Sequence, residues 1–409
     1  MAPLNNSSVK TLEFLPLNGK ITWPPQSHKP IIQYTPGDGV SLIIAQSEAE
    51  FDHLSGNLAR ETIASHPLVP HLDTSQSHAS IISLQVTLFP NAGFCIGLTA
   101  HHAVLDGKSS TMFMKAWAYI CRTFGKEEFG FSFLPPELKP SFDRSLIKDP
   151  NRLDMVYLNQ FTALGANSEP KQYKERSLRI LSNTWRQSKS PDSVRATFQL
   201  NRADIDKLKK RVLTQWDAIN QEGEKKIEKP VNLSTFVATC AYVLVCMNEV
   251  FKDKDIVFGF IADCRARLDP PVDPSYFGNC VFPYIVDTEP GDFTDLVNVA
   301  KKIFNQVKKL EKGAAVLDGA EGLPSKWASL SSSSSKRVIG VSGSNRFRVY
   351  ETDFGWGKPI KVETTTTSGT IGMAESRDGN GGIEIGLVFS KDEMDLFASL
   401  FHSGLEALP

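Results

Sequence analysis

The sequence lacks the local signatures of several large protein classes. Its six cysteines form no Cys-x-x-Cys pair, so neither a zinc knuckle nor a thioredoxin-like redox site is supported. The longest apolar run, near Phe236–Met247, is too short to cross a bilayer. The first residues, MAPLNNSSVK, show no basic segment followed by an apolar one, so no secretory signal peptide is visible. We therefore expect a soluble, cytoplasmic protein without a metal site.

Neither sign of charge is in excess. Lys and Arg number 45 against 46 Asp and Glu, which gives a formal net charge of −1. This balance provides no general attraction to nucleic acid or to an anionic membrane, so we expect neither as a partner. The chain also contains no Gly-x-Ser-x-Gly segment, the nucleophile elbow of α/β-hydrolases. The composition and these absences favour an ordinary globular protein without a serine nucleophile of that type.

Apolar periodicity predicts strands interleaved with helices. Short runs rich in β-branched and aromatic residues predict strands at 40–45, 81–89, 94–99, 194–200, 256–262, 281–287, 337–342, 371–375 and 383–389. Helical patterns occupy 109–124, 234–251, 292–311 and 391–405. Ser109 and Ser234 are the expected N-caps of the first two helices. Because the two kinds of element do not alternate strictly, the pattern favours α/β layers with mixed sheets.

A polar, irregular stretch divides the chain. Residues 166–193 contain Pro170 and Pro191 and show little periodicity. We interpret them as a crossover linker between an N-terminal domain, residues 1–165, and a C-terminal domain, residues 194–409.

Two of the eight histidines stand where chemistry is commonly built. His101 and His102 end a strongly apolar strand pattern, in the segment TAHHAVLDG that closes at Gly107. A histidine with an unperturbed pKa of about 6.5 can accept and return a proton near neutral pH. Asp106 would either orient the ring or pair with a cation and fix the turn. On its own, the His-x-x-x-Asp spacing leaves open two ordinary histidines at a strand end.

A second segment combines rare aromatics with glycines. It reads Asp353-Phe354-Gly355-Trp356-Gly357. Taken alone, it predicts a loop in which backbone passes close to a neighbour and Asp353 holds the turn.

Together, and in this order, the two motifs resemble those of the plant BAHD acyltransferase family. The stretches Leu15–Gly19, Ala262–Leu268 and Tyr276–Cys280 strengthen the resemblance, which runs from about Val9 to the C-terminus. Tyr276–Cys280 reads YFGNC. It resembles the signature of the branch that acylates glycosides of anthocyanins, flavonoids and simpler phenols, often with malonyl-CoA.

The resemblance implies an architecture and a reaction. Family members are monomers with two chloramphenicol-acetyltransferase-like domains and a tunnel between them, in which acyl-CoA and acceptor meet at the histidine. By this likeness His102 is the general base that deprotonates the acceptor hydroxyl, which attacks the thioester. Acyl-CoA, here malonyl-CoA, is a co-substrate, and no bound cofactor is implied. The acceptor is expected to be a phenolic or flavonoid glucoside.

The resemblance also assigns supporting residues. It pairs Asp106 with Arg265 as a brace of the catalytic loop, and it makes Asp353–Gly357 a structural motif remote from the transferred acyl group.

Four hydroxyl side chains are further candidates. Ser234 and Thr235 are candidates to meet CoA phosphate at a helix N-terminus, although plain capping of a core helix is the stronger interpretation of both. Ser342 and Ser344 match a segment that lines the tunnel in relatives. Their hydroxyls are candidates to steady the oxyanion, and serines of a surface turn would look the same.

The chain departs from the family pattern at its start. Family members carry a further strand, helix and loop before the segment equivalent to Leu15–Gly19, where this chain has MAPLNNSSVK. We expect the missing elements to leave apolar surface exposed, with poor solubility or weak activity as the result.

Alternatives in function stay open at this point. The donor could be another acyl-CoA, such as hydroxycinnamoyl-CoA or acetyl-CoA. The short N-terminus also leaves open a non-catalytic relative, against which the retained His102 argues. A hydrolase that passes the acyl group to water has no motif in its favour.

Overall fold

The computed structural model describes residues 17–75, 77–123, 134–149, 151–168, 178, 192–216, 228–310, 316–364 and 368–408. No helix within these ranges is both long enough and apolar enough to span a membrane. The predicted linker, residues 166–193, lies largely outside them. The division into residues 1–165 and 194–409 therefore stays a prediction.

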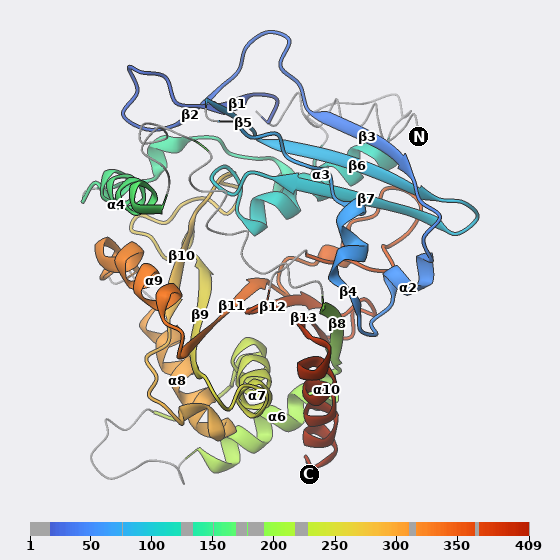
Figure 1. The fold of residues 1–409 in the computed structure, drawn as a ribbon, viewed down its shortest axis with the longest axis vertical. Coiled ribbons are helices and arrows are strands. Elements are labelled where there is room, and N and C mark those ends of the chain that lie inside the picture. Colours follow the sequence, from blue (N-terminus) through green and yellow to red (C-terminus); the bar gives the residue numbers. More distant parts are fainter. Residues whose placement is uncertain are drawn as a thin grey trace.

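Two three-stranded sheets form the upper half of the molecule in Figure 1. One has the antiparallel order β2 (Ile31–Gln33), β1 (Lys20–Thr22), β5 (His78–Ser80). The other has the order β3 (Ser41–Gln46), β6 (Ile82–Phe89), β7 (Gly93–Ala100), with β3 parallel and β7 antiparallel to β6. β7 is the strand that delivers the two histidines.

A mixed seven-stranded sheet crosses the lower half. Its order is β10 (Val281–Ile285), β9 (Asp255–Asp263), β11 (Lys336–Gly343), β12 (Thr370–Glu375), β13 (Ile383–Ser390), β8 (Ser193–Leu200) and β4 (Arg60–Glu61). β11 runs parallel to both of its neighbours, and the other pairings are antiparallel. The last strand, β4, comes from the N-terminal half of the chain and pairs with β8 at the edge of the sheet.

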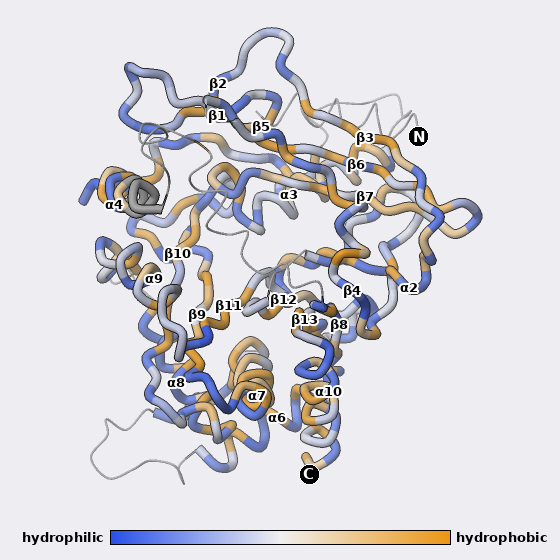
Figure 2. The backbone as a smooth tube through the Cα atoms, in the orientation of Figure 1, coloured by the Kyte–Doolittle hydropathy of each residue, from blue (hydrophilic) through white to orange (hydrophobic). Residues whose placement is uncertain are grey.

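Helices cover these sheets. They are α2 (Phe51–Ser55), α3 (Gly107–Thr123), α4 (Leu153–Ser168), α6 (Arg202–Gln215), α7 (Thr235–Val250), α8 (Leu296–Lys309), α9 (Leu323–Ser332) and α10 (Lys391–Glu406). In Figure 1, α6, α7 and α10 lie below the seven-stranded sheet. The tube of α7 is mostly orange in Figure 2, because this helix is apolar almost all round and is buried between the sheet and the other helices.

Each half has its own apolar core, and residues of the C-terminal half also contribute to the core of the N-terminal half. The larger core is built from β8–β13 and the helices beneath them. The smaller one centres on Phe113 and Trp117 of α3, and it also takes in Phe277 and Phe354 from the C-terminal half. Phe354 meets the Trp117 ring edge to face, with 5.1 Å between centroids. The two halves are therefore joined by exchanged segments as well as by surface contact.

A buried ionic cluster fixes β4 to the other half. Arg60, which is 2% exposed, donates from Nη2 to both carboxylate oxygens of Glu363 at 2.7 Å. Arg195 of β8 is 3% exposed and lies 3.7 Å from the same carboxylate. Nearby, Lys361 donates to Asn57 Oδ1 at 2.7 Å. Such a network ties three segments that are distant in sequence into one fixed arrangement.

The predicted strands all coincide with observed ones, within a few residues at the ends. The predicted helix 292–311 is divided. A 3₁₀ turn occupies Asp292–Thr294, and α8 begins at Leu296 because the Asp295 carboxylate accepts from the Val297 and Asn298 amides. Apolar periodicity does not predict the short strands β1, β2, β4 and β5, nor the helices α2, α4, α6 and α9. Strands of two or three residues are too short to show a period.

Candidate active site

The turn between β7 and α3 presents the two histidines in different ways. The His101 amide donates to the Ile81 carbonyl at 2.7 Å, and His101 Nδ1 accepts from the Ala103 amide at 3.2 Å. Burial, together with the neighbouring charge of His102, lowers the pKa of His101. The His101 ring thus stays neutral and is occupied in shaping the turn.

His102 is exposed at this turn. Within the described ranges, its ring makes no hydrogen bond, whereas its backbone carbonyl accepts from Nδ2 of Asn279. The main chain of His102 is therefore held while the imidazole stays available to a substrate.

Asp106 is buried and fully occupied. Its side chain and that of Arg265 are each 1% exposed, and Arg265 Nη2 lies 2.8 Å from Asp106 Oδ2. Asp106 Oδ1 accepts from the Ser109 amide at 2.8 Å, and Oδ2 accepts from the Cys280 amide at 3.1 Å. The Asp106 carboxylate is thus joined to Arg265 and to two backbone amides, which occupy both of its oxygens.

Arg265 distributes its donors over several segments. Nε donates to the Tyr276 carbonyl at 3.1 Å, Nη1 to Asp263 at 2.9 Å and Nη2 to the Gly278 carbonyl at 2.9 Å. Burial acts to lower the pKa of Arg265, but the charges of Asp106 and Asp263 outweigh it and the pKa is raised. Arg265 is therefore always charged and connects β9, the YFGNC segment and the start of α3.

The prediction that Ser109 caps α3 was wrong. The helix begins at Gly107, and the Asp106 carboxylate accepts from the Ser109 amide as an N-cap does. Ser109 is instead fully buried, where its hydroxyl bridges the Gly278 amide and carbonyl, both at 3.0 Å, and accepts from Arg265 at 3.2 Å. A serine three residues beyond an aspartate is compatible with either arrangement, because only the tertiary contact to Gly278 decides between them.

Asp353–Gly357 lies at the other end of α3. Asp353 Oδ1 accepts from the Gly355 and Gly357 amides at 2.7 and 3.0 Å, and Oδ2 lies 3.8 Å from Arg122 Nη1. Both glycines have positive φ, 105° and 96°, which suits residues without a Cβ. The exposed Trp356 meets Phe94 of β7 at 5.4 Å between centroids. Arg122 is about 22 Å along the helix from Gly107, which separates this loop from His102.

Ser342 and Ser344 stand where β11 ends, near the start of α3. Ser342 is half-buried and pairs in register with Gly372 of β12. The Ser344 hydroxyl accepts from the Arg346 amide at 3.2 Å, and the turn then places Phe347 against Gly107. A Cβ at Gly107 would lie 2.9 Å from the Phe347 ring, so glycine there allows this loop to approach the helix.

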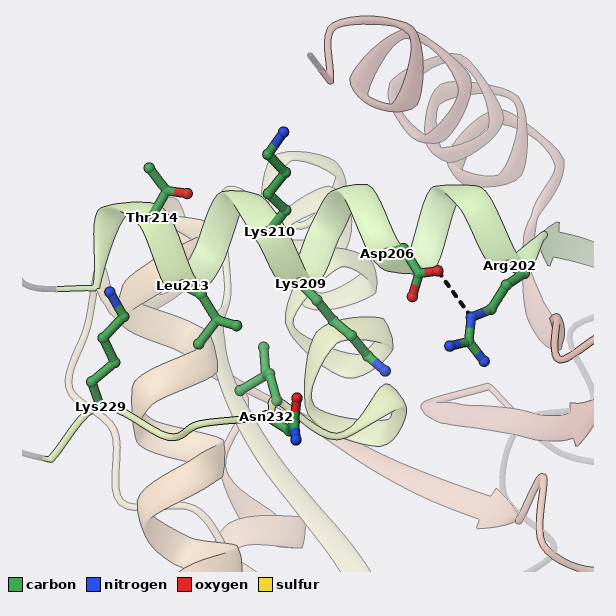
Figure 3. Close-up of a pocket in the computed structure, with 9 residues that line it drawn as sticks. Arg202, Asp206, Lys209, Lys210, Leu213, Thr214, Lys229 and Asn232 are labelled. Atoms are coloured by element: carbon green, nitrogen blue, oxygen red, sulfur yellow. Dashed lines mark hydrogen bonds and ion pairs between the residues drawn. The ribbon is translucent and has the colours of Figure 1, made fainter.

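Ser234 and Thr235 stand at the N-terminus of α7, beside a pocket. Ser234 caps the helix, accepting from the Val237 amide at 3.2 Å, and Thr235 Oγ1 accepts from Lys209 Nζ at 3.0 Å. The pocket has a volume of about 550 Å³ and is lined by Arg202, Asp206, Lys209, Lys210, Leu213, Thr214, Lys229, Asn232 and Leu233. In Figure 3, Lys209 extends from the side of α6 that faces Asn232, and Lys210 from the opposite side. Four cations and a single carboxylate make it a basic pocket.

The described residues hold no group of three or more His, Cys, Asp or Glu side chains arranged to bind a metal ion. The turn presents the exposed imidazole of His102, whose backbone carbonyl is held by Asn279 from the C-terminal half.

Comparison with known proteins assigns the chain to a family. It matches the model of the Transferase family over residues 1–403. It is 39% identical to phenolic glucoside malonyltransferase 1 of Arabidopsis thaliana, over 96% of this chain and 83% of that protein. The chain belongs to the BAHD acyltransferase family. Members of this family are acyl-CoA-dependent acyltransferases, and this chain is one of them.

One further similar protein and one similar crystal structure were found for this BAHD chain. It is 37% identical to malonyl-CoA:anthocyanidin 5-O-glucoside-6''-O-malonyltransferase of Arabidopsis thaliana, over 98% of this chain and 86% of that protein. The crystal structure of vinorine synthase is similar with a TM-score of 0.65 at 18% identity, covering 98% of this chain and 84% of that one. The latter likeness shows the α/β fold.

We predict that Asp106→Ala lowers both stability and activity. The change leaves the buried Arg265 without its closest partner, which should cost about 3 kcal/mol in the free energy of unfolding. Asp263→Ala is the matched control, since its carboxylate is 39% exposed and its loss should cost less than about 1 kcal/mol. Thermal unfolding and acyl-transfer rates check both variants. Lost activity without a lower melting temperature would instead give Asp106 a direct part in proton transfer.

Proposed function

We propose that this enzyme moves a malonyl group from malonyl-CoA to a sugar hydroxyl of a phenolic or flavonoid glucoside, with His102 as the general base. The observation that carries the proposal is the availability of the His102 ring at a turn whose other polar side chains are occupied. The activities of the similar malonyltransferases supply the substrate class. We further propose that the enzyme acts as a monomer in the cytoplasm.

The chemistry follows from one exposed imidazole. Neutral His102 removes the proton from the acceptor hydroxyl as the oxygen attacks the thioester carbonyl, and a tetrahedral oxyanion forms. The oxyanion collapses, the C–S bond breaks, and the imidazolium returns its proton to the departing CoA thiolate. Holding both substrates at one base supplies proximity and proton transfer together. We assign Ser342 and Ser344 as hydroxyl donors to the oxyanion.

Asp106 has no part in these proton transfers. Both of its oxygens already accept hydrogen bonds, from the Arg265 guanidinium and from two backbone amides. We propose instead that Asp106 and Arg265 brace the loop, and that Asp353–Gly357 holds the far end of α3.

The basic pocket on α6 supports a site for the phosphates of the donor. It adjoins Ser234 and Thr235, whose helix N-terminus adds free backbone N–H groups and a favourable dipole. Phe236 of the same helix lies 5.4 Å, between ring centroids, from Phe260 of β9, and Asp263 follows about 10 Å further along that strand. The helix N-terminus therefore stands toward the end of β9 that leads to Arg265. We propose that the pantetheine arm runs from this pocket toward His102.

We predict that His102→Ala abolishes acyl transfer while His101→Ala keeps substantial activity. Removal of a general base typically costs about 10²–10⁴-fold in rate, whereas His101 only shapes the turn. Steady-state rates with a fixed donor and acceptor check the pair, with circular dichroism as the control for folding. Equal losses in the two variants would remove His102 from its assigned role.

We predict that malonyl-CoA is preferred over hydroxycinnamoyl-CoA and acetyl-CoA. The test is competition among the three donors with a panel of phenolic glucosides and their aglycones, followed by mass spectrometry of the products. The expected product is a malonyl ester on the sugar. Preference for another donor, or acylation of an aglycone phenol, would place the enzyme in a neighbouring branch.

We predict that Lys209→Gln raises KM for malonyl-CoA about tenfold with little change in kcat, because one charged hydrogen bond to phosphate is worth about 1.5 kcal/mol or more. Lys207→Gln on the same helix is the matched control, since Lys207 donates to the Leu408 carbonyl instead. Malonyl-pantetheine, which lacks the nucleotide, should react equally with both variants. An unchanged KM for malonyl-CoA would place the phosphates elsewhere.

A further inference from the structure

Asn279 of the YFGNC segment has one hydrogen-bonding atom without a partner. Its Nδ2 donates to the backbone carbonyl of His102. Its Oδ1 is buried and has no hydrogen-bond donor among the residues that the structure describes. Buried polar atoms in folded proteins are nearly always paired, so an exception beside a reactive histidine calls for a functional explanation.

The orientation of this amide is determined by its contact. A backbone carbonyl can only accept a hydrogen bond, so the nitrogen of the Asn279 amide must face the His102 carbonyl. Oδ1 is then the other terminal atom of the same planar carboxamide. The Nδ1 edge of an imidazole lies on the side of its own main chain, so Nδ1 is the ring nitrogen of His102 nearer to the backbone carbonyl that Asn279 contacts.

The neighbours of Asn279 hold it in place from both sides. The Gly278 carbonyl accepts from Arg265 Nη2 at 2.9 Å, and the Cys280 amide donates to Asp106 at 3.1 Å. Asn279 is therefore attached to the same brace that fixes the turn of His102. A side chain held in this way can determine where an adjacent ring points.

We propose that Asn279 is a positioning residue for His102. During catalysis its Oδ1 accepts a hydrogen bond from His102 Nδ1–H, which selects the tautomer with an unprotonated Nε2. Nε2 then takes the acceptor proton, Nδ1 keeps its own, and the amide oxygen stabilises the imidazolium that forms. This inference rests on the proposed function, because it assumes that His102 is the base.

A neutral amide suits this position because the carboxylate of the same turn, Asp106, is unavailable. In serine hydrolases a buried aspartate orients the histidine, but here both oxygens of Asp106 are engaged elsewhere. A carboxylate in contact with the ring would also favour the imidazolium and raise its pKa. The replacement of Asn279 by aspartate should therefore raise the pKa of the His102 ring, whereas a purely structural role of Asn279 predicts no such change.

The test compares pH profiles of kcat/KM for the wild type, Asn279→Asp and Asn279→Ala. His102 is active when unprotonated, so a raised pKa of its ring moves the acid limb of the Asn279→Asp profile to higher pH. Asn279→Ala should lose about 10²-fold in kcat through misplacement of the ring, with KM for both substrates nearly unchanged. The shift is expected with whichever acyl-CoA the wild type accepts, so a wrong donor contradicts the proposed function alone.

Ser109→Ala is the matched control for a structural effect. It removes contacts from the same segment without touching His102, and it should lower the melting temperature while the acid limb stays in place. The inference is overturned if the acid limb of Asn279→Asp coincides with that of the wild type. It is also overturned if Asn279→Ala has a lower melting temperature that accounts for its loss of activity. Such a structural effect is expected for Ser109→Ala only.

Discussion

The buried ion pair between Asp106 and Arg265 is the constraint on which the active-site region depends. Removing two charges from water costs several kcal/mol for each ion, and a single Coulombic contact barely recovers that cost. The pair persists because both groups make further hydrogen bonds. Asp106 accepts from the backbone at the start of α3 and from the YFGNC segment, and Arg265 donates to backbone carbonyls of that segment. The outcome is a defined geometry more than a gain in stability.

That geometry explains how two adjacent histidines come to differ. The first is partly buried, donates its amide to the carbonyl of Ile81 just before β6, and uses its ring within the turn. The second follows the bend and projects outward, while its carbonyl is held by Asn279. The two side chains are chemically identical, so their roles follow from the turn, which Asp106 fixes from one end and β7 from the other.

Much of the fold could be predicted from the sequence, because its longer strands and four of its helices carry apolar patterns. α6 was missed although Ile205, Leu208 and Val212 mark its buried face, since charged residues surround them. β4 has two residues and no local signal at all. Its place in the sheet depends on the contact between Arg60 and Glu363, residues that lie far apart in the sequence.

The site divides in the same way. His102 stands out locally at the end of a strand, but the pairing of Asp106 with Arg265 came from family resemblance, because no periodicity connects residues so distant. Ser109 was assigned as a helix cap, and Asn279 was seen only as part of a motif. The roles of both are determined by backbone groups that the fold brings to them.

The exchange of segments between the halves also has a consequence during synthesis. Trp117 and the rest of the smaller core emerge from the ribosome well before Phe277 and Phe354, which complete that core. At about 5–20 residues per second, Phe354 follows Trp117 by about 12–50 s. During this interval the apolar residues of the smaller core lack the contacts with Phe277 and Phe354, and β4 cannot pair until β8 has been made. The nascent chain is therefore a natural client for chaperones, and its N-terminal half cannot reach its final packing until nearly the whole protein has been made.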